Sequence, residues 1–110
     1  MISFYKSKRI AVMYKDEESA KSWFIHFFTH YFNTVEKVER TRDETRIFLK
    51  DYTVIKIFKF YDGMLGERFD EVYIDNYITE EEIMYVIRPC LIGNQIHYAY
   101  KEVEENEFSC

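Results

Sequence analysis

An apolar stretch that ends in a carboxylate is the first feature that could do chemistry. Residues 70–75, DEVYID, have the composition of a β-strand, and Asp75 stands at its end. A strand-end aspartate can help to hold the magnesium ion of a bound nucleotide. A second carboxylate would orient the attacking water in such a site, whereas Asn76 follows Asp75 here. The sequence therefore favours the alternative, in which Asp75 is a structural residue that turns toward the following loop.

A phosphate-binding loop is the second requirement for nucleotide hydrolysis. Its pattern is G-x-x-x-x-G-K-[ST], in which backbone amides cradle the phosphates and the lysine reaches them. Neither the first residues of the chain nor residues 63–68, GMLGER, match this pattern. We therefore predict that the protein is not an enzyme and has no cofactor.

Two further groupings could hold a metal ion or a nucleophile. His26 and His30 have the i, i+4 spacing of some zinc sites, but Phe27 follows His26 where metalloproteases have a glutamate. Histidines that face solvent are the simpler interpretation, and no metal site is expected. Cys90 and His97 could form a nucleophile pair, but Cys90 follows a proline near an expected helix end, and packing is the simpler role for it.

Basic and aromatic residues are interleaved in residues 56–61, KIFKFY. Such a stretch could stack on single-stranded bases, or it could be the core and rim of one strand. The net charge of −5 favours the second interpretation, because nucleic-acid-binding domains are expected to be basic. The neighbouring lysines also lack the preceding glutamate of a D…E-x-K nuclease motif. Direct binding of nucleic acid is therefore not expected.

The elements that would position these residues follow from the hydrophobic periodicity. Residues 9–15, RIAVMYK, predict a buried strand, and Asp16 offers an N-cap for a helix over residues 17–32. Aromatic residues recur at helical spacing from Trp23 to Phe32. Residues 35–60 contain three β-rich runs separated by short polar stretches, which predicts an antiparallel meander.

The second half of the chain repeats the strand–helix–strand pattern. Thr79 and Glu82 form a capping box, so a helix is expected over residues 80–88, with Pro89 ending or kinking it. Residues 93–94, Gly-Asn, are expected to turn the chain before a last strand over residues 95–103. The predicted fold is α/β or α+β, with a single mixed sheet, the order β-α-β-β-β-β-α-β and two helices packed on the sheet.

Length and composition indicate one domain. The chain has 110 residues, is 47% apolar and contains one proline and three glycines. We predict a compact domain over residues 1–103 and an acidic, mobile tail over residues 104–110. Two cysteines, no signal-peptide pattern and no apolar run of membrane-spanning length predict a reduced, cytoplasmic protein outside the membrane.

The order of these segments resembles a known ATPase core. Residues 9–28, RIAVMYKDEESAKSWFIHFF, are similar to the strand and helix that follow the phosphate loop in phage large terminases and helicase-type ATPases. Residues 45–75 resemble their strand, polar turn, strand, glycine loop and acidic strand. Residues 77–100 resemble the next helix and strand. Because the phosphate loop is missing, the resemblance implies a degenerate core in a small phage-type protein.

The resemblance and the acidity together lead to two functional hypotheses. The first is a non-catalytic phage or mobile-element protein that binds and inhibits a host or defence protein, as anti-CRISPR proteins do, in the host cytoplasm. The second is a degenerate ATPase-like accessory module that contacts DNA or a packaging or replication ATPase. On the first hypothesis the partner is a protein, such as a nucleic-acid-binding nuclease or an ATPase.

Five residues are predicted to contact that partner. Acidic Glu80 and Glu81 would steer the encounter with a basic surface. Aromatic residues near the end of the chain, Tyr98, Tyr100 and Phe108, would anchor it.

Overall fold

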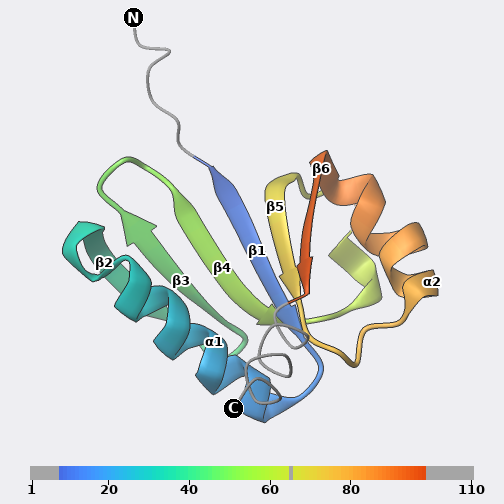
Figure 1. Ribbon diagram of the computed structural model, residues 1–110, viewed down its shortest axis with the longest axis horizontal. Coiled ribbons are helices and arrows are strands. Elements are labelled where there is room, and N and C mark those ends of the chain that lie inside the picture. Colours follow the sequence, from blue (N-terminus) through green and yellow to red (C-terminus); the bar gives the residue numbers. More distant parts are fainter. Residues whose placement is uncertain (1–7, 65, 99–110) are drawn as a thin grey trace, which may run out of the picture.

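The computed structural model describes residues 8–64 and 66–98 of the chain. Six strands form one mixed sheet in the spatial order β2-β3-β4-β1-β5-β6 (Figure 1). The strands are β1 (Arg9–Tyr14), β2 (Val35–Arg40), β3 (Glu44–Leu49), β4 (Val54–Lys59), β5 (Phe69–Ile74) and β6 (Leu91–Tyr98). The predicted fold class and the order β-α-β-β-β-β-α-β are confirmed.

Strand direction divides the sheet into two parts. β1 lies between β4 and β5 and is parallel to both, and β5 is parallel to β6. β2, β3 and β4 form the predicted antiparallel meander. Parallel neighbours need a crossover connection. The helices lie in two of these connections, and in the described part of the chain the one from β4 past β1 to β5 contains only the 3-10 turn Asp62–Met64.

Two helical segments cover opposite faces of the sheet. Helix α1 (Glu17–His30) places Trp23 and Phe27 against Val12, whereas Ile83 of the second helical segment packs in the same cluster as Met13. β1 therefore buries alternate side chains on the two faces, which explains its uninterrupted apolar sequence. Figure 1 shows α1 beside the β2–β4 half and the second helix beside β5 and β6. Each helical segment thus covers about half of its face.

The second helical segment is less regular than predicted. Only α2 (Glu80–Glu82) is α-helical; Ile83–Ile87 forms a π-helical turn and Arg88–Cys90 a 3-10 turn. We refer to residues 80–90 as the α2 segment. Pro89 falls in the first turn of the 3-10 stretch, where its missing N–H is tolerated. The helix therefore changes type and continues to Cys90, beyond the predicted end at residue 88.

Two other boundaries also differ from the predictions. α1 ends at His30, and Phe32–Thr34 forms a separate 3-10 turn in which Phe32 is exposed. The Asp16 side chain makes no capping hydrogen bond. Residues 93–94 lie inside β6, where the pairing with β5 is irregular, so the predicted turn is wrong. A glycine inside a strand often marks such an irregularity.

The predicted domain boundary at residues 103–104 and the acidic tail lie outside the described residues. They remain predictions.

Candidate functional site

The carboxyl ends of β1 and β5 form the most promising place for a site. β1 continues into α1 on one face, and β5 continues into the α2 segment on the other (Figure 1). In open α/β sheets, ligands commonly bind in the crevice beyond such a switch point. Asp75 and Asn76 lie at this edge, as the sequence predicted for a strand end.

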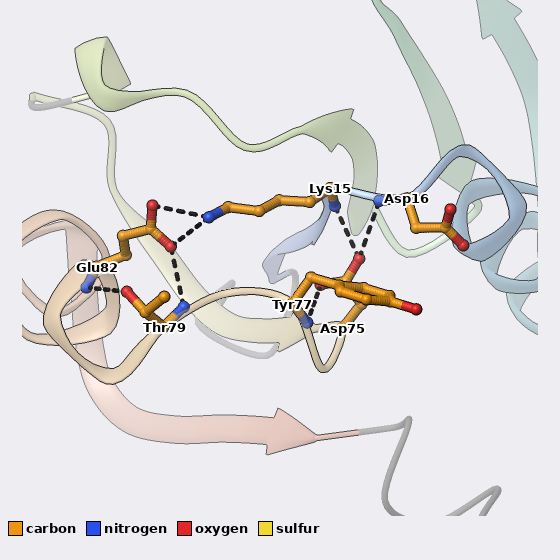
Figure 2. A network of polar contacts seen from close by, with 6 residues as sticks. All are labelled: Lys15, Asp16, Asp75, Tyr77, Thr79 and Glu82. Atoms are coloured by element: carbon orange, nitrogen blue, oxygen red, sulfur yellow. Dashed lines mark hydrogen bonds and ion pairs between the residues drawn. The ribbon is translucent and has the colours of Figure 1, made fainter.

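Asp75 is buried at the switch point and is bound by backbone amides. Its Oδ2 accepts hydrogen bonds from the N–H groups of Lys15 at 2.7 Å and Asp16 at 3.3 Å. Its Oδ1 accepts a hydrogen bond from the N–H of Tyr77 at 3.0 Å (Figure 2). The residue is 2% exposed. The carboxylate therefore fastens the start of the β1–α1 connection to the loop that follows β5.

A second polar group ties β1 to the α2 segment. Lys15 Nζ donates to both carboxylate oxygens of Glu82, at 2.6 and 2.8 Å (Figure 2). Glu82 also completes the predicted capping box with Thr79, in which each residue's side chain accepts from the other's backbone N–H. The hydrogen bond from Lys15, followed by that from the Thr79 backbone, lowers the pKa of Glu82 below its ordinary value.

These contacts engage two of the carboxylates at the switch point. The carboxylate of Asp75 binds three N–H groups and that of Glu82 binds a lysine, so both are already engaged in holding the fold. The glycine loop is also structural, because Met64 is buried and Gly66 adopts a positive φ of 103° that favours glycine. The structural role that the sequence favoured for Asp75 agrees with this geometry.

The histidines do not assemble a metal centre. His26 and His30 are exposed on α1, with ring centroids 6.2 Å apart. His97 lies on a different element and stacks on Tyr73 at 4.3 Å. Within residues 8–64 and 66–98, no group of three or more potential ligands could hold a metal ion.

The cysteine–histidine pair is separated by the sheet. Cys90 is buried in the cluster on the α2 side, and its Sγ donates to the carbonyl oxygen of Met64 at 3.2 Å. His97 stacks on Tyr73, which packs with the cluster on the α1 side. Burial raises the pKa of the Cys90 thiol. Cys90 is therefore a packing residue.

Three of the five predicted partner-binding residues lie in the part of the chain that the structure describes. Glu80 and Glu81 are exposed in the first turn of the α2 segment, and among the described residues neither side chain forms an ion pair. Tyr98 is 41% exposed and lies at the end of β6, opposite Ile74 of β5. All three therefore lie toward the carboxyl edge of the sheet. Tyr100 and Phe108 fall outside the described residues.

Two of the large apolar residues that the structure exposes lie on the α2 segment, and the sequence analysis did not identify them. Met84 is 57% exposed and Tyr85 is 69% exposed on the α2 segment. The spacing of Ile83 and Ile87, which point inward, could have identified Met84 and Tyr85 as outward-facing, whereas Val86 packs against the core. We define the α2 surface as Glu80, Glu81, Met84 and Tyr85. It combines two exposed carboxylates with two large, exposed apolar side chains.

Comparison with known proteins finds no relative of this chain. No protein-family model, curated protein or solved structure matches the chain. The resemblance to terminase and helicase-type ATPase cores therefore remains a prediction. Among the described residues, no helix is long and apolar enough to cross a membrane.

Proposed function

We propose that the protein is a non-catalytic binding protein that inhibits a host or defence protein, and that it uses the α2 surface to do so. The observation that carries this proposal is the exposure of Met84 and Tyr85 beside Glu80 and Glu81. Exposed apolar side chains bordered by charge are typical of protein contact sites. Aromatic residues supply much of the binding energy at such sites.

The charge of this surface defines the kind of partner. The α2 segment begins with three glutamates, of which only Glu82 is neutralised by an ion pair within the described residues. A basic patch with an apolar pocket would complement it, and nucleases and nucleic-acid-dependent ATPases carry basic patches. The proposed origin in a phage or mobile element, and the proposed cytoplasmic location in the host, rest on the sequence pattern.

The switch point supports a role without catalysis. The side chain of Asp75 binds backbone amides, and Lys15 and Glu82 bind each other. On this proposal the purified protein shows no ATP turnover with magnesium. Robust turnover that disappears in Asp75→Ala would contradict the proposal.

Affinity capture from a bacterial lysate, followed by an activity assay on the captured protein, tests the function. The bait is the full chain, compared with the double variant Glu80→Lys/Glu81→Lys. We expect the wild type to capture a nuclease or ATPase and to reduce its activity when both are purified. The double variant should capture at least about tenfold less, because a reversed charge would repel a basic surface.

A matched control distinguishes a contact at the α2 surface from an effect of the net charge of the chain. Glu17→Lys/Glu18→Lys reverses two charges in the first turn of α1, so it changes the net charge by the same amount and also removes the exposed ion pair of Glu17 with Lys59 at 3.9 Å. Capture should survive in this variant. Equal loss in both variants would contradict a contact at the α2 surface. Co-purifying DNA, with no protein target, would support the accessory-module alternative.

A further inference from the structure

One half of one sheet face carries a row of side chains that no helix covers in the described part of the chain. The strand register places Lys37, Phe48, Val54 and Arg9 side by side across β2, β3, β4 and β1. Side chains in register on neighbouring strands share a face. The α2-side cluster draws on β1, β5 and β6 and takes only Phe58 from the meander. The face of the meander is therefore open on this side.

A groove lies along this open face. Its volume is about 360 Å³, within the range of small-molecule sites. It is lined by Arg9, Ile10, Arg46, Phe48, Val54, Lys56, Glu67 and Phe69. Phe48 and Val54 face each other in the strand register and supply apolar wall. The groove thus pairs apolar surface with a few charged groups, as ligand sites do.

The charge of the groove is opposite to that of the chain. Three cations, Arg9, Arg46 and Lys56, line it against one carboxylate, Glu67, whereas the whole chain has a net charge of −5. Glu44 pairs with Arg46 and Lys56 from outside the lining, and including it still leaves one cation in excess. The side chains that line the groove therefore carry a net positive charge, and the nearby carboxylate of Asp70 is bound to the backbone N–H of Arg9 at 2.8 Å.

Arg9 is the cation that remains available. Lys56 Nζ lies 3.4 Å from Glu67 and 3.6 Å from Glu44, so its charge is shared with two carboxylates. The guanidinium of Arg9 lies over the ring of Phe69 at 5.9 Å, and no carboxylate contacts it within residues 8–64 and 66–98. Its planar fork of donors suits a carboxylate, phosphate or sulfonate group.

We propose that this groove binds a small organic anion, with its charged group on Arg9 and its apolar body against Phe48 and Val54. This site is separate from the α2 surface and does not depend on the proposed function. A nucleic-acid strand fits less well. Glu67 would repel a run of phosphates, and the chain as a whole has a net charge of −5.

Titration of the full chain with 8-anilinonaphthalene-1-sulfonate, an apolar fluorophore with one sulfonate, tests the proposal. We expect saturable fluorescence with one site per chain. Arg9→Gln should raise the dissociation constant about tenfold, because the sulfonate loses its hydrogen-bonded, charged partner. Its neutral analogue, N-phenyl-1-naphthylamine, should bind the wild type at least about tenfold more weakly than the anion for the same reason.

Arg40→Gln is the matched control. Arg40 also holds its guanidinium over an aromatic ring, that of Phe24, at 4.5 Å, but this pair lies on the α1 side of the sheet. We expect unchanged affinity in this variant. Equal weakening in both variants, or equal binding of the neutral analogue, would overturn the proposal.

Amide chemical shifts locate the bound probe without any substitution. The proposal predicts that the largest changes occur at residues 9, 46, 48, 54 and 56. Changes confined to the α2 segment or to α1 would overturn it. Light scattering tests whether a second copy of the chain fills the groove instead. A wild-type dimer that becomes monomeric in Arg9→Gln would also overturn the small-anion assignment.

Discussion

At the scale of single residues, Asp75 shows how a carboxylate can serve structure where a catalytic role was conceivable. The short aspartate side chain reaches back to two amides after β1 and one amide in its own loop. Those amides belong to connections that lead to different helices. A buried carboxylate is stable only when its oxygens are hydrogen-bonded, and here the backbone provides the donors.

Asp75→Ala should lower the free energy of unfolding by about 2–4 kcal/mol, because it leaves the N–H groups of Lys15, Asp16 and Tyr77 without their acceptor. Asp75→Asn keeps one acceptor oxygen and should cost less. Urea unfolding followed by the fluorescence of Trp23, which is buried against the sheet, measures the change.

The control for this substitution is Asp70→Ala. Asp70 also accepts a backbone N–H, that of Arg9 at 2.8 Å, but this bond is exposed to water. Water can replace an exposed acceptor, so the loss should stay within about 0.5 kcal/mol. Equal effects of the two substitutions would show that the burial of Asp75 contributes nothing.

At the scale of elements, the α2 segment is fixed at its start by one side chain with two functions. Glu82 caps the helix through Thr79 and pairs with Lys15 at the end of β1. The segment has three helical geometries within eleven residues, so local hydrogen bonding alone holds it weakly. The ion pair attaches its first turn to the central strand.

The pH dependence of stability tests this attachment. The pKa of Glu82 in the folded protein lies below its ordinary value of 4.5. The ion pair therefore stabilises the fold above that pH, and the stabilisation is lost as the pH falls through the folded-state pKa. Glu82→Gln keeps an oxygen for the capping box but removes the charge. We expect it to be less stable by about 1 kcal/mol near neutral pH.

Chemical unfolding at a series of pH values measures the difference between the wild type and Glu82→Gln. The difference should be constant near neutrality and should shrink below pH 4.5. A difference that does not change with pH would mean that the charge of Glu82 contributes nothing, and that the substitution acts only through packing or capping.

Much of this architecture could be predicted from the sequence because local and global preferences agree. The apolar run of β1 is explained by burial on both faces of the sheet. The β-rich runs of residues 35–60 correctly predicted the antiparallel meander. Thr79 and Glu82 carry a local capping signal that needs no tertiary contact. The buried position of Trp23 also followed from helical spacing.

The remaining features depend on tertiary contacts. The π-helical turn at Ile83–Ile87 and the irregular pairing near residues 93–94 adjust elements to the sheet, which local propensity does not encode. The three amides around Asp75 come together only when β1 and β5 are neighbours. The groove beside Arg9 likewise needs the strand order, because its walls come from β1, β3, β4 and β5.

At the scale of the whole molecule, two surfaces of opposite charge occupy different halves of the sheet. The α2 surface is acidic and belongs to the segment that lies beside β5 and β6 in Figure 1. The cations that line the groove come from β1, β3 and β4. A single averaged net charge of −5 hides this division. Substitutions in one surface should therefore leave binding at the other unchanged.

Association kinetics with the captured partner test the acidic surface in the setting of the whole molecule. Between about 0.1 M and about 1 M salt the Debye length falls from ~10 Å to ~3 Å, which screens exposed charges. If Glu80 and Glu81 steer the encounter, added salt should lower the association rate. Glu80→Lys/Glu81→Lys should slow association at low salt and converge with the wild type at high salt.

The other surfaces provide the controls for this measurement. Glu17→Lys/Glu18→Lys and Arg9→Gln should each retain the wild-type rate and its salt dependence, because neither changes the α2 surface. An association rate that changes neither with salt nor with the charge reversals at Glu80 and Glu81 would contradict the electrostatic part of the proposal. The contact would then depend on Met84 and Tyr85, whose exposed apolar surface binds without help from charge.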